Sequence, residues 1–178
     1  INGKMGYSYT EILDDEAINT VINNAKSAAL AIENNDTQFI YEGDKEYKKI
    51  DCYKKELDLV KPDQLIKLAL EMESQCKKQC DKIVNFSGCG IGYGKSTYGI
   101  INYKGLDLKN KRNHLTAYVV PIIEDNNEKY DGMGYVIAEK IEDVNPEKIA
   151  NDGVKEALSR VGGKSISSGK YKIIINNE

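Results

Sequence analysis

The stretch GCGIGYGKSTYGIINY, residues 88–103, decides between two folds for this chain. A phosphate-binding P-loop has the pattern Gly-x-x-x-x-Gly-Lys-Ser/Thr and lies between a buried strand and a helix. Gly94 and Lys95 fit that pattern, but Cys89 stands where its first glycine is required. The residues after Thr97 are β-branched and aromatic, which favours another strand over a helix. The stretch therefore predicts a glycine-rich strand and hairpin.

Segments rich in β-branched and aromatic residues on both sides of this stretch predict a sheet. We expect four strands, at residues 82–93, 97–103, 113–124 and 129–139. Turn-forming residues separate them, at residues 93–96, 104–105 and 124–127. Because consecutive strands joined by short turns pair antiparallel, the sheet is expected to be mixed or mainly antiparallel.

Three helices are expected to pack with this sheet. Asp14 is expected to cap the first, because a short acidic side chain suits that position and apolar residues then recur with helical spacing. Pro62 fits the first position of the second helix, which runs to about Cys80. Asn145, followed by proline, caps the third, and Gly162 supplies its C-terminal stop. Each predicted helix carries one apolar stripe.

The remaining segments are shorter or irregular. Residues 34–36 are expected to end the first helix, and residues 36–60 to form a long polar connection. Short strands are expected at residues 5–10 and 171–175. The order of helices and strands predicts an α+β fold, with a mixed or mainly antiparallel sheet packed with three helices.

Composition narrows the function. The chain has 178 residues, 40% hydrophobic and 30% charged, which suits a soluble protein with one or two cores. Its net charge of −3 does not favour a nucleic-acid partner. No apolar run approaches the length of a membrane span, so no membrane partner is expected. The chain begins at Ile1 rather than methionine, which suggests a piece of a longer protein.

The cysteines and the single histidine do not form a recognisable catalytic pattern. Cys76 and Cys80 are four residues apart in the second predicted helix, so both are expected to be reduced, at least partly buried and metal-free. A zinc site would require a tighter cluster with further cysteine or histidine ligands. His114 stands alone at the start of a strand, where a structural role is expected.

Other charged segments also have simple explanations. Residues 109–112 are a small basic cluster that suits a solvated turn. Residues 162–165 repeat a fragment of the P-loop pattern and fail the same spacing test, because Leu158 stands where the first glycine belongs. The acidic residues at 124–128 suit a hairpin turn. We therefore expect no catalytic, cofactor-binding or metal-binding residues and no cofactor in this chain.

The linear order of features resembles the TldD/PmbA family, whose members are described as modulators of DNA gyrase and as peptidase subunits. Residues 6–18 look like the end of the family's first region, where a glycine-containing strand enters a capped helix. Residues 60–66 look like the start of its middle domain. Residues 102–105 resemble its Asn-x-x-Gly turn. Residues 156–163, followed by 169–174, resemble its helix-to-strand exit into the C-terminal domain.

This resemblance implies that residues 1–45 end a first α/β region and that residues 46–178 form a middle α+β domain. Family members are well over twice as long, and the catalytic branch carries a His-Glu-x-x-x-His zinc motif beyond the equivalent of Glu178. That motif is absent here, and residues 175–178 look more like the PmbA branch, which lacks it.

The resemblance also implies a role. The chain would be a non-catalytic part of a cytoplasmic peptidase-complex subunit that serves assembly or substrate access. The expected partners are a related subunit, in a homo- or hetero-oligomer, and a peptide or protein substrate of the parent zinc peptidase complex.

Two other functions remain open from the residues themselves. The chain could be a stand-alone protein-interaction module, or a nucleotide-binding enzyme that uses residues 88–97. Tyr93, Tyr98 and Tyr103 could anchor a protein interface, because aromatic rings are common there, or could be ordinary sheet residues. The reading frame beyond Glu178 separates a subunit fragment from a stand-alone module, and titration with ATP tests the enzyme.

Overall fold

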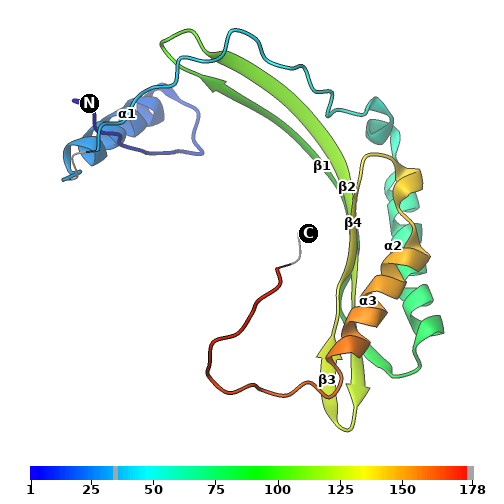
Figure 1. Cartoon of the computed structure of the whole chain (residues 1–178). Coiled ribbons are helices and arrows are strands. Elements are labelled where there is room, and N and C mark those ends of the chain that lie inside the picture. The colour runs from blue at the N-terminus through cyan, green and yellow to red at the C-terminus, as the bar shows by residue number, and fades with distance from the viewer. Residues whose placement is uncertain (34–35, 176–178) are drawn as a thin grey trace. The chain divides into compact units, whose positions relative to one another are not determined.

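The computed structural model describes residues 1–33 and 36–175 (Figure 1). The chain divides into two compact units. The first contains residues 1–49 and 99–109, and the second contains residues 50–98 and 110–178. The described residues contain three α-helices and a four-stranded sheet with antiparallel pairing, which confirms the predicted α+β class.

Helix α1, Asp15–Leu30, organises the first unit. The side chain of Asp14 accepts a hydrogen bond from the amide of Ala17 at 2.7 Å and confirms the predicted cap. The strand predicted at residues 5–10 is wrong, because that segment pairs with no strand and runs against α1 instead. A Cβ atom on Gly6 would lie 1.8 Å from the carbonyl oxygen of Ala25, so only glycine permits this contact.

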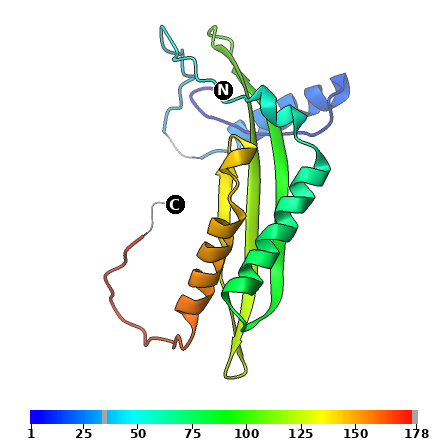
Figure 2. The same cartoon turned by 90° about the vertical axis from the view of Figure 1, so that its right-hand side faces the viewer.

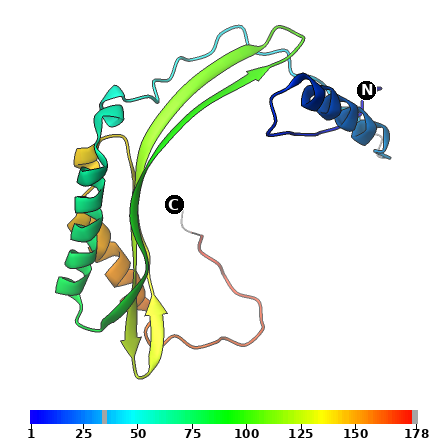
Figure 3. The same cartoon turned by 180° about the vertical axis from the view of Figure 1, so that it is seen from behind.

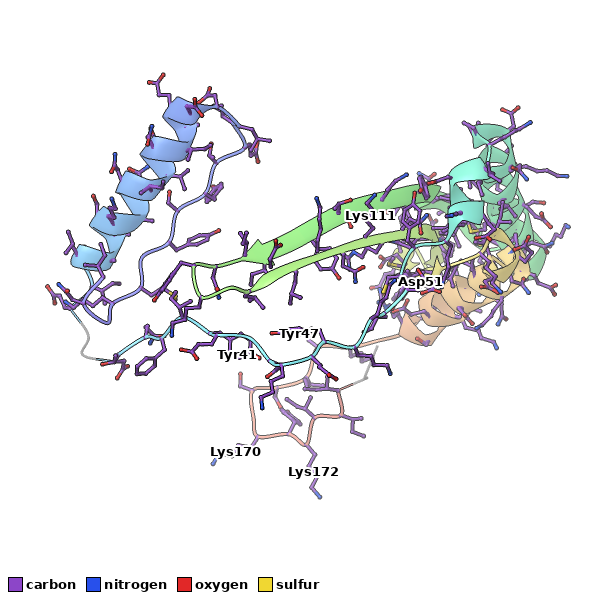
Figure 4. The ribbon with its side chains drawn as sticks, turned by 90° about the horizontal axis from the view of Figure 1, so that it is seen from above. Tyr41, Tyr47, Asp51, Lys111, Lys170 and Lys172 are labelled. Carbon is purple, nitrogen blue, oxygen red and sulfur yellow. The ribbon has the colours of Figure 1, made fainter. Side chains whose placement is uncertain are left out.

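The turn between β1 and β2 also belongs to the first unit. Asn102 closes it by accepting hydrogen bonds from the amides of Lys104 and Leu106, at 3.0 and 3.2 Å. Gly105 has φ of +100°, a conformation that favours glycine. The Asn102 side chain also donates to the carbonyl of Tyr41 at 2.6 Å, and so fastens the turn to the extended segment that carries Tyr41 and Tyr47 (Figure 4).

The sheet is built on two long strands, β1, Ile83–Ile101, and β2, Asp107–Asp125. The predicted turn at residues 93–96 is wrong, because β1 continues through it as one strand. Glycines weaken a strand but do not break it. The chain reverses only at Asn102, where the side chain supplies turn hydrogen bonds. The strand character expected after Thr97 is confirmed.

Strands β3, Glu128–Asp131, and β4, Gly134–Ala138, both pair antiparallel with β2. The sequence predicted a single strand here. The two pairings share one register, which places Pro121 of β2 opposite Gly132. Proline has no N–H to donate, so the ladder is interrupted at that point. The hairpin at Asn126 and Asn127 is confirmed by their positive φ angles, 51° and 64°.

Helices α2, Pro62–Gln79, and α3, Pro146–Arg160, cover the same face of this sheet (Figures 2 and 3). Asn145 caps α3 by accepting from the amide of Lys148 at 3.0 Å. The helices and β2 share one core of buried apolar side chains. Its fully buried members include Met72, Cys76, Leu115, Ala117, Val119 and Ala150.

Glycines set the distance between α3 and the sheet. A Cβ atom on Gly134 would lie 1.8 Å from the carbonyl oxygen of Ile149. A Cβ atom on Gly132 would lie 2.1 Å from the amide nitrogen of Ala157. The backbone of α3 therefore rests almost directly on the backbone of the paired strand.

The segment after α3 does not form the strand predicted at residues 171–175, and these residues run without a strand partner in the described chain. Two short 3₁₀ helices, Lys55–Leu59 and Ile141–Asp143, were not predicted. The predictions for Asn34, Asn35 and residues 176–178 concern positions outside the described residues. No described helix is both long and apolar enough to cross a membrane.

Candidate functional site

Strand β1 has glycine at four alternate positions, 88, 90, 92 and 94, so this part of the strand presents no side chains on the face of the sheet that α2 and α3 leave open. A Cβ atom on Gly88 would lie 3.1 Å from the ring of Tyr118, and one on Gly90 would lie 3.5 Å from it. A Cβ atom on Gly94 would lie 2.8 Å from the ring of His114. These glycines therefore make room for two rings that reach across from β2. Gly92, between them, has nothing near its Cβ position.

The lysine of the P-loop-like stretch belongs to a polar cluster on the other side of β1. Its ammonium lies 3.1 and 3.3 Å from the two carboxylate oxygens of Asp58, in the 3₁₀ helix Lys55–Leu59. The hydroxyls of Tyr53 and Tyr93 both donate to the same carboxylate. Lys95 also lies 5.0 Å from the centre of the Tyr53 ring. We call Tyr53, Asp58, Tyr93, Lys95 and Asn113 the Asp58 cluster.

Asn113 anchors this cluster to the sheet and is only 3% exposed. Its side-chain oxygen accepts from the amide of Lys54 at 2.8 Å, and its nitrogen donates to the carbonyl of the same residue at 2.8 Å. The nitrogen also donates to the hydroxyl of Tyr93 at 3.2 Å. One buried amide therefore satisfies the backbone of the incoming segment and connects it to the Asp58 cluster.

The electrostatics of the cluster favour a permanent ion pair. Hydrogen bonds from Tyr53 and Tyr93, and then the ammonium of Lys95, lower the pKa of Asp58 to about 2. Hydrogen bonds to Tyr53 and Asp58 raise the pKa of Lys95 above its usual value. The Asp58 carboxylate raises the pKa of Tyr93. A general base or nucleophile needs a pKa near the working pH, and these shifts move the groups away from it.

A cavity of about 510 Å³ lies next to this cluster and belongs to the second unit. Its walls come from residues 54–64 and from residues 140–142. Leu57, Val60 and Ile141 make it partly apolar, while Lys54 and Lys140 bring positive charge. The Lys54 ammonium already lies 3.3 Å from the carboxylate of Glu139.

The thiols are structural. All four cysteines are free, Cys76 is fully buried and Cys80 is half-buried, as the helical pattern predicted. Burial raises the pKa of Cys76 to about 12 and also raises the pKa of Cys89. The thiolate is the nucleophilic and metal-binding form, so both groups are held in the unreactive state. Among the described residues, no group of three His, Cys, Asp or Glu is placed to hold a metal ion.

The other charged segments considered in the sequence, and His114, do not all come together in one site. The basic segment 109–112 lies in β2 rather than in a turn, and Arg112 donates to the hydroxyl of Ser96 at 3.2 Å. Asp125 pairs with Lys82 at 2.6 Å. Residues 162–165 follow α3, and the amide of Gly162 donates to the hydroxyl of Tyr130 in β3 at 3.3 Å. His114 and the Asp58 cluster lie on opposite faces of the sheet.

Sequence reasoning missed the Asp58 cluster. Asp58 and Tyr53 lie in a segment that looked irregular, more than thirty residues before the lysine that they contact. The only available signal was the alternation of Tyr93 and Lys95, which directs both side chains to one face of a strand. No local spacing indicated where their acidic partner would come from.

The family follows from a comparison with known proteins. Residues 55–161 match the family model of the PmbA/TldA metallopeptidase central domain, which covers more than half of the chain. The chain belongs to the PmbA/TldD family. The match begins at the 3₁₀ helix that carries Asp58 and ends at the C-terminal end of α3.

Individual PmbA/TldD relatives agree with this assignment. A metalloprotease PmbA homolog from Buchnera aphidicola is 24% identical over 163 residues, which is 88% of this chain and 36% of that protein. The chain thus spans about a third of the length of this relative.

Solved structures show the same fold. A protein described as a modulator of a DNA gyrase from Thermotoga maritima matches 95% of this chain and 38% of its own, with a TM-score of 0.68 and 24% identity. A similarly described protein from Bacteroides thetaiotaomicron gives 0.75, with 18% identity over 96% of this chain and 40% of its own. TldE from Thermococcus kodakarensis gives 0.62, with 16% identity over 90% and 35%.

Proposed function

We propose that this chain is a non-catalytic part of a TldD/PmbA-like metallopeptidase subunit and that it serves assembly or substrate access. The parent acts in the cytoplasm on a peptide or protein substrate, together with a related subunit in a homo- or hetero-oligomer. This part holds no cofactor or metal of its own. The proposal rests on the family match and on one structural observation, the open face of the sheet.

The open face is apolar and flat. In the register of β2 and β4, Tyr118 pairs with Tyr135 and Thr116 pairs with Ile137. Their alternation places these side chains opposite the buried Leu115. Tyr118, Tyr135 and Ile137 are 37%, 45% and 65% exposed. Exposed apolar surface of this kind marks a contact with another polypeptide.

The Asp58 cluster supports a structural role for the other face. Its carboxylate and ammonium are already paired, and its tyrosines are already donating. Lys95 is therefore engaged and is not presented to a nucleotide phosphate. This favours a subunit that acts through its surface over the nucleotide-binding enzyme.

Crosslinking tests the proposal. The photoreactive residue p-benzoyl-phenylalanine replaces Tyr118, whose ring it resembles, in the purified chain. A matched variant carries it at Leu70, which is 63% exposed on the outer side of α2. Both are irradiated with an unstructured 20-residue peptide. We expect peptide adducts from position 118 and far fewer from position 70.

Two results would count against this function. Equal yields at the two positions would show that the open face has no preference for polypeptide. Saturable binding of ATP that is lost in Lys95→Ala would favour the nucleotide-binding enzyme instead.

A further inference from the structure

Arg112 places a positive charge on the open face of the sheet. Side chains alternate along β2, so Arg112 lies on the same face as His114 and Tyr118. Its Nε donates to the hydroxyl of Ser96 in β1 at 3.2 Å, so the guanidinium reaches across this face. No described residue accepts a hydrogen bond from its two terminal nitrogens. Arginine binds carboxylates through these nitrogens, which form a planar fork.

His114 places a second donor beside this guanidinium. The two residues are two positions apart in β2, so their Cα atoms are about 7 Å apart. The imidazole lies over Gly94, whose Cβ atom would come within 2.8 Å of the ring. No described residue hydrogen-bonds to the ring nitrogens, and the described chain has no buried polar side-chain atom without a partner, so both nitrogens reach solvent. An imidazole carries at least one N–H donor.

The glycines of β1 leave the space beside these donors free. Gly92, between the positions covered by the Tyr118 and His114 rings, has nothing within 4 Å of its Cβ position. A polypeptide can therefore lie on this floor and direct a side chain towards Arg112. A terminal carboxylate is usually captured by a nest of free backbone amides. The backbone of β1 and β2 is engaged in the sheet here, which favours a side-chain carboxylate instead.

The charges on this face select an acidic partner. Among residues 88–98 of β1 and 110–118 of β2, the side chains on the open face include no acid, and Arg112 is their one lysine or arginine. Glu139, which follows β4 on the same face, is paired with Lys54 at 3.3 Å. A carboxylate that approaches Arg112 therefore meets an unpaired positive charge and no acidic side chain from these strands.

Two other occupants fit this face less well. Residues 161–175 of the same chain carry Lys164, Lys170 and Lys172 and no acid, so their charge has the same sign as that of Arg112. A nucleic acid is held by several cations along its phosphates, whereas this part of the face offers one arginine. One carboxylate side chain matches one guanidinium.

We infer that Arg112 and His114 bind a glutamate or aspartate side chain of a polypeptide that lies on the open face. The carboxylate accepts hydrogen bonds from the terminal nitrogens of Arg112, with the His114 ring beside it. The neighbouring residues of that polypeptide lie over Gly92 and extend towards Tyr118. This inference rests on the proposed function and names the class of polypeptide that this face selects.

Fluorescence anisotropy tests the inference with a decapeptide of glycine, serine and tyrosine that has one central glutamate. Both ends are capped and the dye is uncharged, so the glutamate is its one charge. Arg112→Gln removes the guanidinium. Lys111→Gln is the matched control, because it removes the same charge from the next residue, whose side chain lies on the opposite face (Lys111 is labelled in Figure 4). We expect Arg112→Gln to weaken binding by about fivefold, the strength of a good exposed ion pair, and Lys111→Gln to change it little.

A second peptide, with glutamine in place of glutamate, completes a double-mutant cycle. It binds the unchanged chain about fivefold more weakly than the glutamate peptide does, and Arg112→Gln weakens it no further. Arg112→Lys keeps the charge but lacks the fork, and restores only part of the affinity for the glutamate peptide. A glutamine peptide with a free terminal carboxylate binds like the capped one. Circular dichroism establishes that each variant retains the fold.

Equal losses in Arg112→Gln and Lys111→Gln would overturn the inference, because net charge alone would then explain them. Equal losses for the glutamate and glutamine peptides would also overturn it. If the free terminal carboxylate restored full affinity, the site would belong to a chain end and not to a side chain. A concentration-dependent dimer that Arg112→Gln abolishes would assign the face to a second copy, and tighter binding of an oligouridylate would assign it to nucleic acid.

Crosslinking at position 118 reports separately on the proposed function. Preferential adducts there, with no effect of Arg112→Gln on the glutamate peptide, would contradict the recognition of an acidic side chain and leave the proposed function standing.

Discussion

Asn113 of β2 anchors the backbone of Lys54, near the start of the second unit. It is buried and serves both backbone groups of Lys54. We predict that Asn113→Ala lowers the free energy of unfolding by about 1–3 kcal/mol, because it leaves buried backbone groups unpaired. Urea denaturation measures this change. Asn85→Ala, at an exposed position of β1 in the same sheet, is the control and should change stability little.

A variant at Asn113 that unfolds at the same urea concentration as the unchanged chain would contradict the anchoring role. No sequence pattern distinguished this asparagine from its neighbours in a basic, polar segment. Its importance comes from a contact with a residue 59 positions earlier, which local spacing does not encode.

Asp58 predicts a dependence of stability on pH. Its pKa is lowered in the folded protein to about 2, below the value of about 3.9 for an unperturbed aspartate. Its contribution is therefore present above pH 4 and is lost as the pH falls towards 2. We expect Asp58→Asn to lose less stability than the unchanged chain between pH 5 and pH 2. Thermal melts across this range measure the difference.

Glu71→Gln, which alters an exposed acid on α2, is the control for this experiment. Its acid sensitivity should match that of the unchanged chain. Parallel melting curves for Asp58→Asn and the unchanged chain from pH 5 to pH 2 would show that the ion pair with Lys95 does not stabilise the fold.

At the level of elements, the contact between α3 and the strands depends on glycine. We predict that Gly134→Ala lowers the free energy of unfolding by at least about 1–3 kcal/mol, because the added Cβ would overlap the backbone of α3. Gly92→Ala is the matched control in the same sheet, since nothing lies near its Cβ position. It should be neutral or slightly stabilising, because alanine restricts the unfolded chain.

Chemical denaturation of the two glycine variants separates these effects. Equal stability of Gly134→Ala and Gly92→Ala would mean that α3 can move away from the sheet at no cost. That result would contradict the close backbone contact.

The helices could be predicted because their signals are local. Asp14 and Asn145 are caps whose partners lie three residues away, and the structure confirms both. The prediction of the strands was less accurate. The split between β3 and β4 falls at Gly132 and Met133, where glycine gave a weak local sign of it. Its other cause is Pro121, which lies opposite in another strand and which the local pattern does not include. Strand prediction failed at residues 5–10 because Gly6 packs on α1 instead of pairing.

At the level of the whole molecule, the resemblance to the TldD/PmbA family is confirmed, and the peptidase role remains a proposal. We predict that the purified chain with added zinc does not hydrolyse unstructured peptides. Zinc hydrolysis requires about three protein ligands and an open water position, and the described chain has one histidine. Mass spectrometry of the peptides after incubation measures cleavage. Metal-dependent cleavage that survives repurification and disappears in His114→Ala would contradict the non-catalytic role.

The ratio of peptide adducts from position 118 to those from position 70 bears most directly on the open sheet face as a polypeptide surface. Both positions are accessible, but only Tyr118 lies on the flat, glycine-lined face. We predict a ratio well above one that falls when unlabelled peptide competes. A ratio near one, unchanged by competitor, would contradict the proposal that this part of the subunit acts through that face.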